Sequence, residues 1–318
     1  MRGKLKPAAP LGALMATHRD RPTSALPSVP WVDHIVHGDA RAVLRRLPKG
    51  SVHLAITSPP YNVGIPYAGY SDDRTYVGYR RWLSTVWRAL YRALVPGGRF
   101  ALNVAPTSIK NFRPIHHDLT RDLVRVGFLL RAEILWYKQT MGRRTAWGSW
   151  KSPSNPHVIP SWEYVLIFSK ETDRLEGDAS QADITGEEFQ RYSDAFWEIP
   201  PERNRRGHPA PFPAELIRRL VKFYSYRGNT VVDMFGGTGT VASVAYATGR
   251  RFISIDASME YCALALERVR ETKVEPGVAR REAPRDVVEG PGLTSERGRR
   301  PARRREKAGG ELAHRVGE

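Results

Sequence analysis

The segment Thr57-Ser58-Pro59-Pro60-Tyr61-Asn62 combines groups that could bind a nitrogenous base. Consecutive prolines fix the backbone and remove two N–H donors, so their carbonyls remain as hydrogen-bond acceptors. Ser58 adds a hydroxyl, and Tyr61 adds a flat aromatic face on which a base could stack. A proline-rich turn at the end of a strand is the structural alternative. Two acceptors and an aromatic ring next to a cofactor site favour a role in binding a base over a purely structural turn.

Such a cofactor site is indicated by a second motif, which runs from a strand through a glycine turn into a helix: Val231-Val232-Asp233-Met234-Phe235-Gly236-Gly237-Thr238-Gly239-Thr240. Glycines let the backbone approach a ligand closely, and a helix N-terminus offers free N–H groups. Asp256 follows Gly239 by 17 residues and ends the next predicted strand, within reach of ribose hydroxyls. The turn lacks the Gly-Lys-Ser/Thr of a Walker A loop and the third glycine of a dinucleotide fingerprint. An adenosine-bearing cofactor without a pyrophosphate fits better.

These motifs need an α/β scaffold, and the chain has the pattern of one. Short apolar runs predict strands, and amphipathic runs between several of them predict helices. The expected strands are 52–57, 99–104, 132–137, 164–168, 230–234 and 252–255, and the expected helices are 79–94, 115–126, 213–224 and 240–248. This alternation predicts a doubly wound, mostly parallel sheet.

Composition divides the 318 residues into three parts. Residues 1–30 are rich in Pro, Ala, Arg and Ser and predict a flexible basic arm. Residues 31–272 form the expected catalytic domain, with a small insertion at about 139–206. Residues 273–318 are rich in Arg, Glu, Gly and Pro, which is typical of a disordered basic tail.

Charge and cysteine content narrow the class of protein. Lys and Arg number 50 against 33 Asp and Glu, a net charge of +17 that favours a polyanionic partner such as nucleic acid. The only cysteine, Cys262, lies in a helical pattern and is expected in the core, which excludes a disulfide-stapled domain. His116 and His117 are expected at a helix start rather than on a metal. No apolar run is as long as a membrane span, so a cytoplasmic protein is expected.

The two motifs, with Ser58–Tyr61 before Phe235–Gly239, resemble those of the permuted β class of DNA amino-methyltransferases. That family carries Ser/Asp-Pro-Pro-Tyr before Phe-x-Gly-x-Gly. Smaller matches over about residues 33–270 include Gly38-Asp39, Trp136-Tyr137-Lys138 and Glu163–Phe168. The resemblance implies the fold of S-adenosylmethionine-dependent methyltransferases, with a circularly permuted motif order.

The resemblance also implies roles for individual residues. Ser58 and the Pro59 carbonyl, held by Pro60, would accept hydrogen bonds from an exocyclic amine, and Tyr61 would stack on a flipped base. S-adenosylmethionine would be the cofactor. Its expected contacts are Asp39 at the adenine, Asp256 at the ribose, and, around the methionine and sugar end, Asp233, Phe235, Gly236, Gly237, Gly239, Thr240, His208 and Phe212.

Double-stranded DNA is the expected partner. Basic and aromatic side chains in two loop-like stretches are the candidate DNA contacts: Arg143, Arg144, Trp147, Lys151, Arg203 and Arg205. Segment 171–206 is the least family-like and is expected to hold the recognition element. A partner restriction endonuclease and a homodimer are left open by the sequence.

The sequence therefore predicts a DNA methyltransferase, with cytosine N4 favoured over adenine N6 because Ser58 is typical of cytosine enzymes in this family. A methyltransferase acting on RNA or on a protein amide is one alternative. A catalytically silent nucleic-acid-binding protein is another, and the intact Ser58–Tyr61 and Phe235–Gly239 motifs argue against it.

Overall fold

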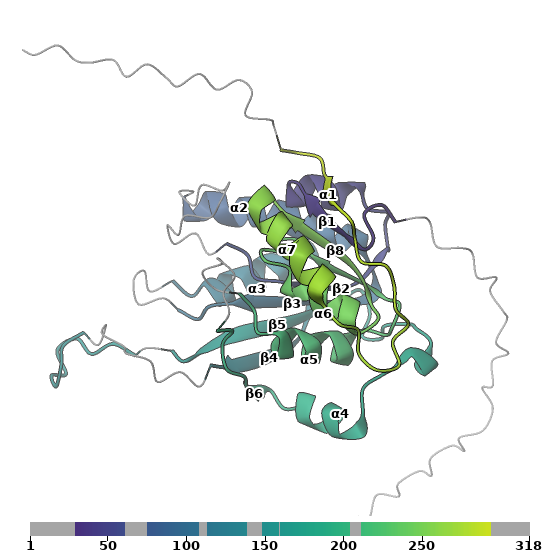
Figure 1. Ribbon diagram of the computed structural model, residues 1–318. Coiled ribbons are helices and arrows are strands. Elements are labelled where there is room, and N and C mark those ends of the chain that lie inside the picture. Colours follow the sequence, from purple (N-terminus) through teal and green to yellow (C-terminus); the bar gives the residue numbers. More distant parts are fainter. Residues whose placement is uncertain are drawn as a thin grey trace, which may run out of the picture.

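A computed structural model describes residues 29–60, 75–107, 113–138, 148–158, 160–203 and 211–293 (Figure 1). Within these residues a nine-stranded sheet has the order β6-β4-β5-β3-β2-β7-β8-β1-β9. The strands are β1 His34–His37, β2 Val52–Thr57, β3 Leu94–Val104, β4 Phe128–Tyr137, β5 Trp162–Lys170, β6 Phe196–Glu198, β7 Thr230–Asp233, β8 Arg251–Asp256 and β9 Val287–Glu289. Strand β5 is antiparallel to both its neighbours, and the remaining pairings are parallel. The predicted doubly wound, mostly parallel sheet is confirmed.

Helices cover both faces of this sheet (Figure 1). They are α1 Ala40–Arg46, α2 Tyr76–Ala93, α3 Ile115–Val126, α4 Gly186–Tyr192, α5 Ala214–Tyr224, α6 Thr240–Ala247 and α7 Met259–Glu271, with a short 3-10 helix at Ala179–Gln181. Helices α1, α2 and α3 bury their apolar sides in one core cluster, and α5, α6 and α7 bury theirs in a second cluster on the opposite face. None of the helices in the described part of the chain is long and apolar enough to cross a membrane.

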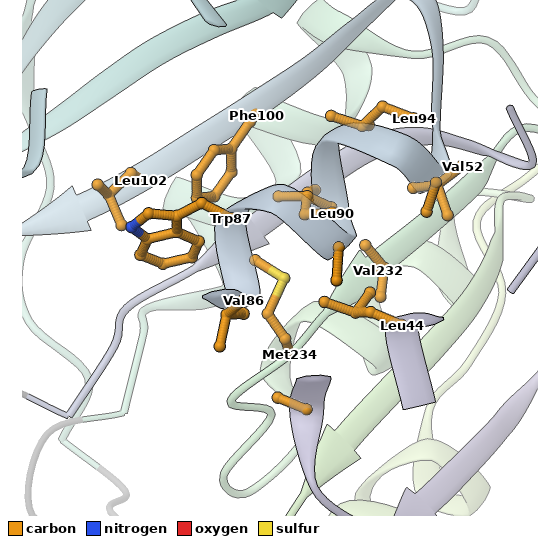
Figure 2. Close-up of a cluster of buried hydrophobic side chains, with 14 of the residues drawn as sticks. Leu44, Val52, Val86, Trp87, Leu90, Leu94, Phe100, Leu102, Val232 and Met234 are labelled. Carbon is orange, nitrogen blue, oxygen red and sulfur yellow. The ribbon is translucent and has the colours of Figure 1, made fainter. Parts of the chain in front are cut away.

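Helix α2 shows how the sequence produces this packing. Thr75 caps its first turn by accepting from the Gly78 N–H, and buried residues recur every three or four positions along one side. Figure 2 shows Trp87 and Leu90 of this helix against Phe100 of β3. Burying a large apolar side chain contributes about 1.5–3 kcal/mol, so this face fixes α2 over the middle of the sheet.

The predicted elements agree with the structure to within a few residues for most helices and strands. Helix 115–126 and strand 52–57 have the predicted bounds, and the remaining predicted elements are found with shifted ends. Strands β1, β6 and β9 and helices α1 and α4 were not predicted. Each of these five is three to seven residues long, too short for a clear period. The 13-residue helix α7 was indicated only by the helical pattern around Cys262, without bounds.

Two predicted boundaries are wrong in part. Residues 273–293 are not a tail, because β9 lies parallel to β1 with Ile35 opposite Val287 and so extends the sheet. The expected insertion at 139–206 includes β5, which is a central strand paired with both β3 and β4. The arm at residues 1–28 and the tail from residue 294 lie outside the described residues.

The segment after β5 is tied to the core by a buried ion pair. Both carboxylate oxygens of Asp183 accept from Arg250, at 2.6 and 2.7 Å, and the Arg250 side chain is fully buried. Arg250 also donates to the backbone carbonyls of Ser225 and Thr248. Because the guanidinium is satisfied on several sides, the pair positions the segment that carries α4 and β6.

Asp183→Ala should lower the free energy of unfolding by about 3–5 kcal/mol, because it leaves the Arg250 charge buried without its partner. Chemical denaturation of the full chain measures this. Glu282→Ala is the control, since it breaks an exposed ion pair with Arg285 and should change the midpoint little. Equal midpoints for the two variants would contradict the assigned role of Asp183.

Candidate active site

The two predicted motifs meet at the carboxyl edge of the sheet. Strand β7 lies between β2 and β8, and β1 follows β8. The ends of these neighbouring strands carry Ser58, Asp233, Asp256 and Asp39. Ligands of open α/β sheets bind at this edge, so the topology brings the predicted amine-binding and cofactor-binding residues together.

A buried hydrogen bond joins the two motifs. The Thr57 hydroxyl donates to Asp233 Oδ1 at 2.6 Å, and the Phe235 N–H donates to the same oxygen at 3.1 Å. Thr57 and Asp233 are 0% and 3% exposed. Burial raises the pKa of Asp233 to about 7, although the hydrogen bonds from Thr57 and Phe235 favour its ionised form. The end of β2 is thereby fixed to the start of the glycine turn.

The glycine turn has a backbone that larger residues could not adopt. Gly239 has φ 77° and begins α6, and a Cβ atom there would lie 2.6 Å from the Cβ of Ala265. At Gly236 an added Cβ would lie 2.2 Å from Ser254 Oγ. Among the described residues no side chain caps α6, so its first N–H groups point out of the helix end without such a partner.

Asp256 is held rigidly beside this turn. Its Oδ2 accepts from the Gly237 N–H and its Oδ1 accepts from the Ser258 N–H, both at 2.8 Å. Burial raises the pKa of this carboxyl group, and the backbone hydrogen bonds oppose that effect. A carboxylate has about four acceptor positions, so it has capacity for ligand hydroxyls in addition to these bonds.

Asp39 has a structural task at the end of β1. It is the N-cap of α1, accepting from the N–H groups of Arg41 and Ala42 at 2.9 and 3.0 Å, and it pairs with the Arg41 guanidinium. The predicted contact with an adenine would use a carboxylate that is already oriented by these bonds. That role stays a prediction.

Phe212 and Thr240 lie on the α5 side of the glycine turn. The Thr240 hydroxyl is 3.5 Å from the Phe212 carbonyl oxygen, and the Phe212 ring packs against the second core cluster. Arg268 of α7 bonds to Thr240 Oγ1 and to the Thr238 carbonyl, and sequence reasoning missed it. It also missed the role of Thr57, whose position directly before Ser58 at a strand end was the available signal.

Two of the predicted DNA contacts, Lys151 and Arg203, are described, and they lie in segments that follow the carboxyl ends of β4 and β6. Lys151 is exposed on the loop 148–158, with its Nζ 5.8 Å from the Trp150 ring centroid, and Arg203 is exposed after β6. The residues of which the structure gives no account are Tyr61, Arg143, Arg144, Trp147, Arg205 and His208.

Cys262 and the histidine pair are found where the sequence placed them. Cys262 is buried in α7, where burial raises the pKa of its thiol to about 12. His116 and His117 lie in the first turn of α3, and the His116 ring stacks on Tyr164 with 4.6 Å between centroids. These residues therefore belong to the core and to a helix start.

Comparison with known proteins points to a single family. Residues 52–267 match the model of the N6/N4 methyltransferase family, described as DNA methylase. The type II methyltransferase M.MjaI of Methanocaldococcus jannaschii is 30% identical over 71% of this chain and 88% of its own. The DNA adenine methyltransferase YhdJ of Escherichia coli K12 is 28% identical over 74% of this chain and 82% of its own.

A solved structure shows the same fold. The putative DNA modification methylase TTHA0409 of Thermus thermophilus, complexed with S-adenosyl-L-methionine, superposes with a TM-score of 0.63 and is 31% identical. The match covers 82% of this chain and 99% of that one.

The buried carboxyl group of Asp233 makes stability depend on pH. Its folded-state pKa is about 7, above the ordinary 3.8, so the folded chain binds more protons than the unfolded chain between these values. The free energy of unfolding should therefore fall as pH rises from about 4 to 7. Asp233→Asn cannot titrate, so at pH 8 it should be more stable than the wild type, by up to about 4 kcal/mol.

Denaturant titrations at pH 5 and pH 8 measure this difference. Asp178→Asn is the matched control, because the backbone hydrogen bond from Ser180 lowers the pKa of that exposed carboxylate. The free energy of unfolding of Asp178→Asn should fall between pH 5 and pH 8 as it does in the wild type, because Asp233 is still present. A wild-type stability that does not fall across this window relative to Asp233→Asn would contradict the assignment.

Proposed function

Since the chain belongs to the DNA methylase family of N6- and N4-directed enzymes, we propose that it methylates cytosine at N4 in double-stranded DNA. The methyl donor is S-adenosylmethionine, and the product is a site-specific methylation mark. The observation that carries the proposal is the Thr57–Asp233 hydrogen bond, because it fixes an amine-binding motif beside a cofactor turn.

The described residues fit this cofactor. The Phe235–Gly239 turn packs tightly against Ser254 and Ala265 and ends where no described side chain caps the first turn of α6, and Asp256 offers an oriented carboxylate to ribose hydroxyls. The carboxyl group of Asp233 lies at the same turn and, when ionised, favours a positively charged ligand. Bound S-adenosylmethionine supplies a methyl group on a positively charged sulfur.

The protein has to make an aromatic amine nucleophilic, because the nitrogen lone pair is shared with the ring. In the proposed function the Ser58 hydroxyl and the Pro59 carbonyl accept the two amine N–H groups and draw the nitrogen toward a tetrahedral geometry. The nitrogen then forms a bond to the methyl carbon as the carbon–sulfur bond breaks with its electron pair remaining on sulfur. One amine proton leaves to solvent. No nucleophile from the protein is required, which agrees with the buried Cys262.

The target base has to leave the duplex to reach this edge, at a cost of about a few kcal/mol. Tyr61 follows Pro60 in the motif and would stack on the extruded base, which offsets part of that cost. Arg143, Arg144, Trp147, Lys151, Arg203 and Arg205 are proposed to contact the DNA. The similarity to type II methyltransferases supports a partner endonuclease that cuts the same site.

The choice of cytosine is based on Ser58, since serine at this position is typical of cytosine enzymes in the family the chain resembles. A neutral hydroxyl replaces the charged carboxylate found in many adenine enzymes. Adenine N6 is the alternative target, and one relative is named as an adenine methyltransferase.

DNA from a host expressing the protein should contain N4-methylcytosine when it is digested to nucleosides and analysed by mass spectrometry. The same host expressing Asp256→Ala serves as the control and should show little of it. N6-methyladenine without N4-methylcytosine would overturn the choice of base, and neither product would overturn the proposed function. Methylome sequencing of the same DNA gives the recognition site.

Substitution of Asp256 should weaken binding of the methyl donor, whereas substitution of Tyr61 should impair the reaction with DNA. Asp256→Ala should weaken S-adenosylmethionine binding by about tenfold to a hundredfold, because the loss of charged hydrogen bonds costs about 1.5–3 kcal/mol. Tyr61→Ala should keep cofactor affinity but lower kcat/KM for DNA by about fivefold to a hundredfold, since base stacking contributes about 1–3 kcal/mol. Calorimetry and single-turnover kinetics measure the two effects. Equal loss of cofactor affinity in both variants would contradict the assignment of Tyr61.

A further inference from the structure

Three polar side chains form a row on the opposite side of β2 from the cofactor turn. Asn103 Nδ2 donates to Glu163 Oε2 at 2.6 Å, and the Lys138 ammonium group pairs with Glu163 Oε1. They come from the end of β3, the start of β5 and the position after β4, which are adjacent strands (Figure 1). We define Asn103, Glu163 and Lys138 as the polar row.

The polar row begins next to the amine-binding motif. Thr57 pairs with Leu102 in the parallel β2–β3 ladder, so the residues that follow, Ser58 and Asn103, stand level with each other. Side chains alternate along a strand, and these two therefore belong to the same face of the sheet. Asn103 is thus the strand neighbour of the residue proposed to bind the target amine.

Burial and charge suit this row to a polar ligand. Asn103 is 3% exposed, while the side chains of Glu163 and Lys138 are 17% and 27% exposed. An ion pair at this depth loses hydration, and apolar residues of similar size would serve packing at least as well. The row is accessible at its Lys138 end, where Nζ also lies 4.6 Å from the Trp136 ring centroid.

The chemistry of the target base matches the row. Both cytosine and adenine present an exocyclic amine beside an unprotonated ring nitrogen, N3 in cytosine and N1 in adenine. Ser58 and Pro59 offer acceptors to the amine, but the ring nitrogen needs a donor. The Lys138 ammonium group is a donor, and its pairing with Glu163 keeps the row close to neutral. A neutral row does not oppose the positive charge that develops on the base as its amine takes the methyl group.

We propose that the polar row binds the flipped base. Lys138 donates to the ring nitrogen beside the amine, and Asn103 and Glu163 position Lys138. This inference rests on the proposed function. It assigns the base to the β3–β5–β4 side of β2 and the cofactor to the β7–β8 side.

The test uses DNA duplexes that contain the recognition sequence. One duplex has the natural target base, and the other has its deaza analogue, in which a carbon replaces the ring nitrogen beside the amine. The measured quantity is the ratio of kcat/KM for the natural duplex to kcat/KM for the deaza duplex, compared between wild type and Lys138→Met. Comparing the ratios cancels the different intrinsic reactivity of the two amines. The wild-type ratio should exceed the Lys138→Met ratio by about tenfold or more, because losing a hydrogen bond to a charged donor costs about 1.5–3 kcal/mol.

Lys222→Met is the control, since Lys222 pairs with Glu188 in a more deeply buried ion pair between α5 and α4. It should keep the wild-type ratio. Glu163→Gln is a second variant that preserves size, and it should reduce discrimination by releasing Lys138. S-adenosylmethionine affinity close to that of the wild type verifies folding of each variant.

A natural-to-deaza ratio in Lys138→Met or in Glu163→Gln that equals the wild-type ratio would overturn the inference. Methyl transfer, and therefore the proposed function, would remain intact. A wild-type ratio equal to the ratio of solution reactivities would overturn it without any variant. Absence of methyl transfer by the wild type on every duplex would instead count against the proposed function.

Discussion

The hydrogen bond from Thr57 to Asp233 is the constraint on which the rest of the site depends. The two residues are 176 positions apart in the chain, yet they end adjacent strands. Methyl transfer between two bound molecules requires their reacting atoms to be aligned within about half an ångström. Residues next to Thr57 are proposed to bind the amine, and residues next to Asp233 to bind the methyl donor. In the proposed function, the bond of 2.6 Å between Thr57 and Asp233 fixes the two binding segments to each other before either substrate arrives.

The same bond has a cost in stability. Asp233 is a carboxyl group in a nearly dry environment, and burial raises its pKa to about 7. A threonine and an apolar partner could pack β2 against β7 without this penalty. The protein retains the carboxyl group at the edge where a cationic ligand would be bound, which is where stability is commonly sacrificed for function. The glycine turn is constrained in the same way, because Gly239 adopts a positive φ against Ala265.

The central strands and both motifs could be predicted from the sequence because their signals are local. Strand β2 is mostly apolar and buried, and the Ser58–Tyr61 and Phe235–Gly239 motifs follow strands directly. Strand β9 has no such signal, since Val287–Glu289 becomes a strand only by pairing with β1. Asp39 was predicted as a ligand, but its bonds to the N–H groups of Arg41 and Ala42 depend on where α1 begins. The Thr57–Asp233 bond required the order of strands, which no local pattern contains.

The antiparallel strand β5 explains how the polar row can lie at the functional edge. In a purely parallel sheet only carboxyl ends of strands meet there, and these are followed by loops. Because β5 runs in the opposite direction, its first residues, including Glu163, reach the carboxyl ends of β3 and β4. A side chain on a paired strand is held more rigidly than one on a loop, and precise sites favour such positions. Reversal of one strand thus places Glu163 between Asn103 and Lys138, where two donors from neighbouring strands converge on a single carboxylate.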